Sequence, residues 1–299
     1  MKTYFVSDVH LGLQVGDPAD RERRFTDFLN ALPSDTESLY LLGDIWDFWY
    51  EYRDVVPKGY VRVFAAIQEL MDRGVDVYFM TGNHDIWAYS YFEELGMKRV
   101  SQPYLVEIAG KKFCLGHGDG LGPVPFGYRV IQTIFHCRPL QVLFSMLHPW
   151  IAFSFGNTWS RHSRLSHDAE YVFGGADEPL YKFVSDYEKE HSVDYFIFGH
   201  YHTHVDMLTP AGARLLILKD WISSSPYIVF DESTAMLDPI GRRQVMATME
   251  KLNKEYNHMC VKHENEELKL AEKIGKIKKS IESGEKFVKD CQEHLKDFE

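Results

Sequence analysis

The chain has 299 residues, of which 45% are hydrophobic, and this suits one large domain or one domain with an appendage. Its formal net charge of −11 argues against a general nucleic-acid binder, whose surface should be basic. The four cysteines form no CxxC pair, which argues against a disulfide framework and a thiolate zinc site, whereas the excess of carboxylates suits a protein that binds divalent cations.

The first part of the chain alternates between strand-like and helix-like segments. Short β-rich runs end at glycine or polar residues, and stretches with helical spacing separate them. This order predicts a mostly parallel sheet whose faces are covered by helices. The predicted elements are, in chain order, Tyr4–Ser7, Arg21–Ala31, Ser38–Leu42, Tyr60–Met71, Val75–Met80 and Lys112–Leu115.

The alternation resumes after a long irregular stretch. A helix is expected near Glu178–Glu190 and a strand at Tyr195–Phe198. Short strands follow around Val205–Leu208, Arg214–Leu218 and Tyr227–Phe230, with Gly and Pro between them, and we expect this end to be antiparallel. The sequence therefore predicts an α/β fold.

The segment at about 121–168 interrupts this pattern. It is rich in large apolar residues and carries four arginines: Arg129, Arg138, Arg161 and Arg164. We expect helical hairpins that lie as a cap over the functional site. The alternatives are a cap that binds lipid and the ordinary packing of a helical subdomain.

Residues 239–299 differ in composition from the rest, so we place the main domain at 1–238 and a charged helical tail at 239–299. The tail is rich in Lys and Glu, and its apolar residues recur at alternating steps of four and three, as in a coiled-coil seam. Gly275 and Gly284 interrupt the pattern. A coiled coil used for self-association and an exposed charged helix are both open. The seam comprises Leu270, Ile274, Ile277, Ile281, Gly284, Val288, Cys291 and Leu295.

Side chains that bind metals follow five of the predicted strands. Ligands of open α/β sheets bind beyond the carboxyl ends of the strands, so we expect these clusters to converge. Glycines in front of several of them allow the chain to turn sharply. The clusters are Asp8 with His10, Asp44, Asn83 with His84, His117, and His200 with His202.

These residue types suit a site with two metals. A carboxylate such as Asp44 can bridge two cations, and imidazole with oxygen ligands suits Mn, Fe or Zn. Two metals about 3.5–4 Å apart activate a water and hold the attacking and leaving oxygens of a displacement. We therefore expect two divalent cations, Mn²⁺ first with Fe or Zn as alternatives, and phosphoryl chemistry.

The motifs DxH, GDxxD, GNHD, GH and GHxH, in this order from Asp8 to His202, resemble the calcineurin-like metallophosphoesterase superfamily. The resemblance implies the fold of that superfamily, an α+β sandwich of mixed sheets flanked by helices, and a set of ligands for each metal. The implied ligands of one metal are Asp8, His10, Asp44 and His202, and those of the other are Asp44, Asn83, His117 and His200.

The same resemblance implies roles for four more side chains. His84 would contact the scissile phosphate or protonate the leaving group, and Asp85 would orient His84. Asp47 and Asp119 are candidates for orienting the ligands from outside, and each could instead cap a turn.

Within the superfamily, the motif spacing, the apolar insertion and the C-terminal strands are similar to the UDP-2,3-diacylglucosamine pyrophosphatase family of lipid A biosynthesis, over about residues 1–238. The resemblance implies cleavage to a diacylglucosamine 1-phosphate and UMP. The best-known members of that family carry Arg where this chain has His84. A different nucleotide, phosphodiester or phosphoprotein substrate is therefore the alternative, and a third is a non-catalytic scaffold that uses the tail.

A lipid-linked nucleotide substrate agrees with the apolar insertion, whose arginines could grip a pyrophosphate. No signal peptide and no run of about 18 apolar residues is visible, so we expect a cytoplasmic protein in peripheral contact with the inner membrane, with no nucleic-acid partner. The candidate substrate contacts are Asn83, His84, Tyr128, Asn157, Ser160, Arg161 and Arg164.

Overall fold

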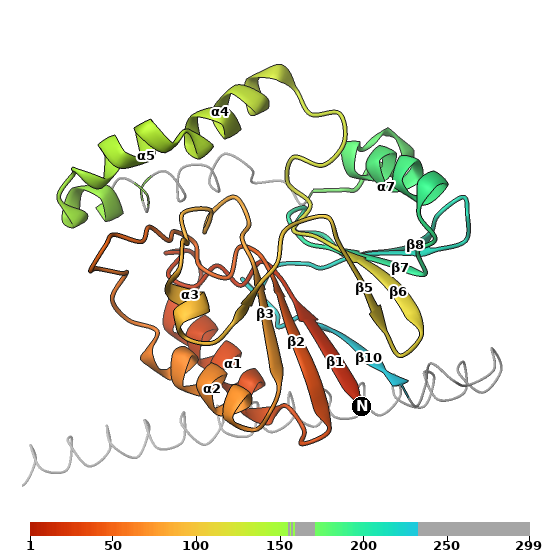
Figure 1. Cartoon of the computed structure of the whole chain (residues 1–299), viewed down its shortest axis with the longest axis horizontal. Coiled ribbons are helices and arrows are strands. Elements are labelled where there is room, and N and C mark those ends of the chain that lie inside the picture. Colours follow the sequence, from red (N-terminus) through yellow and green to blue (C-terminus); the bar gives the residue numbers. More distant parts are fainter. Residues whose placement is uncertain (155, 157, 159–170, 233–299) are drawn as a thin grey trace, which may run out of the picture. The chain divides into compact units, whose positions relative to one another are not determined.

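The computed structural model describes residues 1–154, 156, 158 and 171–232 (Figure 1). The chain divides into two compact units, Met1–Ala235 and Met236–Glu299. The fold described below is that of the first unit. The predicted tail at 239–299 lies outside the described residues, and the predicted boundary at residue 238 stays a prediction.

The first sheet has five strands in the order β10-β1-β2-β3-β4 (Figure 1). Strands β1 (Lys2–Val6), β2 (Thr36–Leu42), β3 (Asp76–Met80) and β4 (Lys98–Arg99) are parallel. Strand β10 (Ile228–Asp231) pairs antiparallel with β1. The carboxyl ends of β1, β2 and β3 therefore meet at one edge.

The second sheet also has five strands, in the order β5-β6-β7-β9-β8. Strands β6 (Lys111–Leu115), β7 (Tyr195–Phe198) and β9 (Arg214–Ile217) are parallel. The outer strands β5 (Tyr104–Ile108) and β8 (Val205–Leu208) are antiparallel to their neighbours. This sheet thus provides a second set of parallel carboxyl ends.

The residues of each strand alternate between two buried faces. The core therefore has three layers of apolar side chains: one between the sheets and one on the outer face of each sheet. Tyr4 and Val6 of β1 pack with the helices of the first sheet, while Phe5 between them faces the second sheet. Helices α1 (Pro18–Ala31) and α2 (Val61–Asp72) pack on the first sheet. The result is two mixed sheets face to face with helices outside, which confirms the predicted fold class.

Helix α7 (Pro179–Glu190) covers the second sheet through Leu180 and Val184. The short 3-10 helix η1 (Gly175–Asp177) precedes it. The short helix α3 (Tyr91–Glu94) belongs to the first sheet, where its Phe92 joins the core. Strands β4 and β5 and helix α3 were not predicted.

Two further helices, α4 (Phe126–His136) and α5 (Arg138–Ser145), lie within the segment predicted to be a helical cap. Neither contains a buried residue. They are held by hydrogen bonds from the segments that follow β2 and β3: Tyr50 donates to the Gln141 carbonyl at 2.7 Å, and the Trp87 indole donates to the Phe135 carbonyl at 3.0 Å. Figure 1 shows both helices on the side where β1, β2 and β3 end.

Candidate metal centre

The predicted clusters come together where the parallel strands of the two sheets end. The first three follow β1, β2 and β3, and the other two follow β6 and β7. In the described part of the chain, three groups of side chains could each hold a metal ion, with ligand atoms within 4.8 Å of one another. The groups are Asp8 with His10 and His202, His10 with Asp44 and His84, and Asp8 with Asp44 and His117.

The backbone at these positions is unusual. Side chains with a Cβ rarely adopt a positive φ, and such conformations gather at functional sites. Here a positive φ occurs at five of the predicted ligands, and this geometry turns their side chains toward one point. The angles are 55° at Asp8, 49° at His10, 53° at Asp44, 68° at His200 and 51° at His202.

Hydrogen bonds between the turns lock this arrangement. The Asp8 and His10 amides donate to the carbonyls of Gly43 and Asp44 at 3.1 and 2.9 Å. The His200 amide donates to Asp8 Oδ2 at 3.0 Å, which joins the second sheet to the first. A Cβ on Gly199 would overlap both Ser7 Oγ and Asp8 Oδ2, so this close approach requires glycine.

Two carboxylate oxygens in the centre are buried and accept no hydrogen bond from any described residue. Asp8 Oδ1 lies 3.7 Å from His10 Nε2 and 3.6 Å from His202 Nδ1. Asp44 Oδ2 lies 3.8 Å from His10 Nε2 and 3.3 Å from His117 Nε2. An ionised carboxylate buried without a partner is strongly destabilising, so these oxygens point to a bound cation.

The histidine tautomers support the same conclusion. His117 Nδ1 lies 3.0 Å from the Leu42 carbonyl, and His10 Nδ1 lies 3.1 Å from Asp47 Oδ1. Because a carbonyl or carboxylate oxygen only accepts, both Nδ1 atoms carry the proton, which leaves a lone pair on Nε2 of the neutral ring. When the rings are neutral, these lone pairs face carboxylate oxygens, an arrangement that a metal ion would stabilise. The donor set therefore fits two divalent cations.

Without a cation, the buried carboxylates favour a proton on the His117 ring, and a metal ion bound at Nε2 would take the place of that proton. Burial alone would raise the pKa of Asp44, but neighbouring His117 holds that pKa well below its usual value. Burial alone would lower the pKa of His117, but Asp44 raises it well above its usual value. Burial and the charge of His117 lower the pKa of His200 to about 4, so His200 is neutral and able to coordinate a metal.

His84 lies beside the candidate ligands, and Asp47 is the residue that orients it. His84 Nδ1 donates to the Asp47 carbonyl at 2.8 Å, and the His84 amide donates to Asp44 Oδ1 at 2.8 Å. The carboxylate of Asp85 instead accepts the backbone N–H groups of Gly82 at 2.7 Å and Ile45 at 2.9 Å. Asp85 thus ties the turns after β2 and β3 together.

The remaining predicted residues divide into two sets. Asp119 lies beside the turn of His117, and the Tyr128 hydroxyl donates to Asp119 Oδ2 at 3.4 Å. Asn83 is at the centre, where its Oδ1 lies 3.3 Å from His117 Nε2. The other candidate substrate contacts, Asn157, Ser160, Arg161 and Arg164, lie outside the described residues.

Asp220 is a further candidate that sequence reasoning missed. It follows β9, a third parallel strand of the second sheet, and its Oδ2 lies 3.4 Å from His202 Nδ1. The Trp221 amide next to it donates to the Asp8 carbonyl at 3.0 Å. The available signal was a carboxylate soon after a predicted strand, the same signal that marked Asp44.

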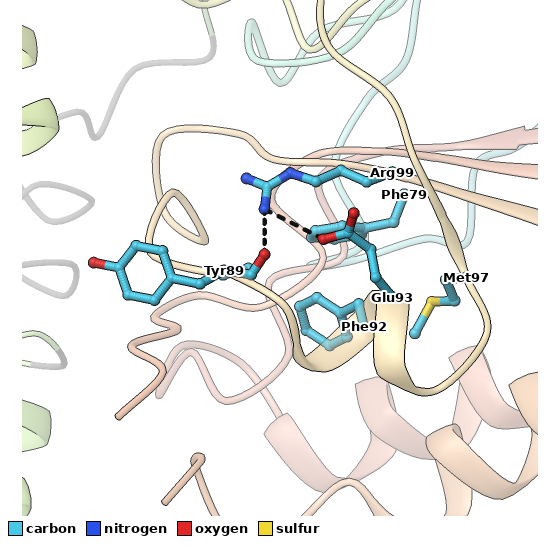
Figure 2. Close-up of a pocket in the computed structure, with 7 residues that line it drawn as sticks. Phe79, Tyr89, Phe92, Glu93, Met97 and Arg99 are labelled. Atoms are coloured by element: carbon cyan, nitrogen blue, oxygen red, sulfur yellow. Dashed lines mark hydrogen bonds and ion pairs between the residues drawn. The ribbon is translucent and has the colours of Figure 1, made fainter. Parts of the chain in front are cut away.

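A small pocket elsewhere in the first sheet has a different character (Figure 2). The Arg99 guanidinium donates to the Tyr89 carbonyl at 2.6 Å and lies 3.8 Å from the Glu93 carboxylate, as the dashed lines in Figure 2 indicate. The pocket is otherwise lined by apolar side chains such as Phe79 and Phe92, and its lining includes no predicted metal ligand.

Comparisons with known proteins agree with this site. The family model described as Calcineurin-like phosphoesterase matches residues 1–204. A UDP-2,3-diacylglucosamine hydrolase of Porphyromonas gingivalis is 35% identical over 253 residues, 79% of this chain and 97% of that protein. A protein of the same name from Aeromonas salmonicida is 27% identical over 77% of this chain and 89% of its own length.

Among solved structures, a dimetal phosphatase from Danio rerio superposes with a TM-score of 0.42 at 17% identity, over 77% of this chain and 91% of that one. The family match covers the full set of clustered motifs, from Asp8 to His202. This chain belongs to the calcineurin-like phosphoesterase family.

Proposed function

We propose that this chain hydrolyses the pyrophosphate of UDP-2,3-diacylglucosamine to 2,3-diacylglucosamine 1-phosphate and UMP, with two bound divalent cations, Mn²⁺ in the first place. The observation that carries the proposal is the pair of buried oxygens, Asp8 Oδ1 and Asp44 Oδ2, that accept no hydrogen bond from any described residue and face histidine nitrogens. The substrate is proposed because several relatives bear the name UDP-2,3-diacylglucosamine hydrolase.

Each cation would be held by one half of the centre. We assign Asp8, His10 and His202 to one cation, and Asn83, His117 and His200 to the other, with Asp44 between them. Asp44 suits the bridging position because its Oδ2 faces both His10 and His117. When bound, the cations would supply a polarised water and neutralise the charge on the phosphate oxygens.

The protein side chains would then manage position and protons. Asp47 fixes two rings at once, since its carboxylate holds His10 Nδ1 and its carbonyl holds His84 Nδ1. With Nδ1 held as a donor, a protonated His84 would present its second proton on Nε2. We propose that His84 gives this proton to the leaving phosphate oxygen.

The proposed reaction consumes one water. Its oxygen forms a new bond to one phosphorus, the anhydride P–O bond breaks, and the bridging oxygen leaves with the other phosphate. A lipid-linked monophosphate and UMP result. Tyr128, Asn157, Ser160, Arg161 and Arg164 stay candidates for contacts with this substrate.

The cap suits a substrate with acyl chains. Its most exposed apolar side chains are those of Phe126, Met146 and Trp150, which expose 82%, 78% and 74% of their surface. Residues 120–167 contain no Asp or Glu, although the whole chain carries a formal charge of −11. An apolar surface with arginines and no carboxylates is suited to an anionic lipid surface.

We therefore propose that the cap contacts the acyl chains and the inner face of the membrane, and that the protein is cytoplasmic and peripheral. No helix among the described residues is long and apolar enough to cross a membrane. Self-association through residues 239–299 also stays a proposal.

The test compares two substrates that share a pyrophosphate, UDP-2,3-diacylglucosamine and UDP-N-acetylglucosamine, with bis-p-nitrophenyl phosphate as a generic diester. We expect UMP release from the diacylated substrate to exceed that from the soluble one by at least about tenfold in kcat/KM, because remote binding energy raises this ratio. Equal rates on both sugars would contradict the lipid assignment. Hydrolysis of the diester alone would direct the search to other nucleotides.

A further inference from the structure

Gln102 contacts the turn that carries His117, although no motif includes it. It lies in the segment before β5, within the part of the chain that sequence analysis left without an element. Its amide makes three hydrogen bonds of 2.8 Å to this turn: Oε1 accepts from the Gly118 amide, and Nε2 donates to the carbonyl and to Oδ1 of Asp119. The Gln102 side chain therefore uses both its donor and its acceptor groups to hold this turn.

The same turn meets the cap on its other side. Asp119 Oδ2 lies 3.4 Å from the Tyr128 hydroxyl and 3.4 Å from Gln132 Nε2, both on helix α4. Asp119 is buried, and one of its oxygens faces Gln102 while the other faces the cap. His117, two residues before Asp119, contacts the centre through Asn83 and Asp44.

We propose that Gln102 is a positioning residue that places His117 for metal binding. Through Asp119, it also couples the packing of cap helix α4 to the metal centre. The chemistry favours glutamine here. A carboxylate at position 102 could accept from the Gly118 amide, but it would repel Asp119 and donate nothing. The inference rests on the two-metal site of the proposed function and not on its lipid substrate.

The test measures Mn²⁺ binding by calorimetry for the full chain and for Gln102→Glu. Loss of a partner that orients a metal ligand typically weakens metal binding by about 10–100-fold. We expect that loss for one of the two Mn²⁺ ions, with the other unchanged, and faster cleavage by trypsin after Arg129 in α4. Two Mn²⁺ ions bound with unchanged affinity would overturn the proposal.

A second variant separates positioning from general damage. In Gln102→Glu/Asp119→Asn the donor and acceptor of the side-chain pair exchange places, because the new amide can donate to the new carboxylate and its oxygen can still accept from Tyr128, while the bond to the backbone carbonyl of residue 119 is not restored. We expect Mn²⁺ affinity to recover to within about tenfold of the parent protein, as in a coupled double-mutant cycle. The single variants Gln102→Glu and Asp119→Asn complete the cycle. The proposal is contradicted if the double variant binds Mn²⁺ no better than the weaker of the two single variants, or if its loss of binding free energy equals the sum of their losses.

Gln68 provides the matched control. Its Nε2 donates to Asp72 Oδ1 at 2.9 Å on the exposed face of helix α2, so it repeats the Gln–Asp pairing away from the centre. Gln68→Glu should leave both Mn²⁺ affinities unchanged, and a loss there would mean that the charge alone is responsible. All readouts avoid the lipid substrate, so inactivity toward UDP-2,3-diacylglucosamine with normal Mn²⁺ binding would defeat the proposed substrate and leave Gln102's role standing.

Discussion

At the scale of single residues, the candidate metal centre is defined by buried carboxylate oxygens and histidine nitrogens that lie 3.3–3.8 Å from one another. Asp44 contacts both halves of the centre, since its Oδ1 accepts from the His84 amide while its Oδ2 faces His10 and His117. Removing its charge should affect both cations at once.

Asp44→Asn keeps the shape of the side chain and removes the charge. We expect bound Mn²⁺, measured by elemental analysis after gel filtration, to fall from two per chain to less than one. Asp72→Asn, on the exposed face of α2, should retain two. An Asp44→Asn protein that still holds two Mn²⁺ ions would rule out the bridging role.

His84 is close enough to His10 and Asp44 to belong to a metal-binding group, and it is also placed to donate a proton. The variant His84→Ala distinguishes the two roles. Loss of a general acid lowers kcat by about 10²–10⁴-fold, and we expect this loss with Mn²⁺ content unchanged. If the variant instead loses one Mn²⁺, His84 is a ligand.

At the scale of secondary-structure elements, the centre depends on how closely the turns approach one another. Gly199→Ala would place a methyl group against Ser7 and the Asp8 carboxylate. We expect weaker Mn²⁺ binding and a fall in stability of about 1–3 kcal/mol, measured by urea unfolding. Gly127→Ala in α4 meets no atom within 4 Å and should be neutral or slightly stabilising. If the two variants have equal stability and Mn²⁺ affinity, the close approach of the turn at Gly199 to Asp8 is not required for the centre.

The cap gives a prediction of its own. Phe126→Glu/Met146→Glu introduces charges on its exposed apolar face, and we expect binding to vesicles that contain phosphatidylglycerol to fall by at least about tenfold in a sedimentation assay. Cleavage of the generic diester should not change. Val61→Glu, an exposed site of 75% on α2, is the control. Undiminished vesicle binding by the cap variant would contradict the proposal that the cap contacts the membrane.

Many of the strands and helices were predictable because the sequence signals that define them are local. The strands Tyr195–Phe198 and Val205–Leu208 were predicted with the bounds that the structure has, since short β-rich runs lie between clear turn residues. Strand β5 was missed although Tyr104, Val106 and Ile108 alternate with outward residues. The pairing of Gln102 with Asp119 had no local signal, because it depends on segments that only the tertiary fold brings together.

At the scale of the whole molecule, the pattern of elements predicted converging strand ends and the resemblance predicted mixed sheets, but neither assigned the individual strands to the two sheets. Parallel strands leave the same periodic pattern whether they extend one sheet or start another, so β1–β2–β3 and β6–β7–β9 could not be told apart as separate sheets. The aromatic layer between the sheets, from Phe5 and Tyr40 to Phe113, joins the two halves of the centre.

The charge distribution also belongs to this scale. A chain of net charge −11 keeps residues 120–167 free of carboxylates and gathers buried carboxylates at the strand ends. The two regions match the two parts of the proposed substrate, since cations held by the carboxylates would bind the pyrophosphate and the apolar cap would contact the acyl chains.

The most direct test of this account is UMP release from UDP-2,3-diacylglucosamine by metal-depleted protein as Mn²⁺ is restored. We expect no activity without metal, full activity at two Mn²⁺ per chain, and a rise in melting temperature of about 10–20 °C when Mn²⁺ is at one hundred times the dissociation constants of both sites. Activity that survives complete metal removal, or two bound Mn²⁺ ions without any release of UMP, would contradict it.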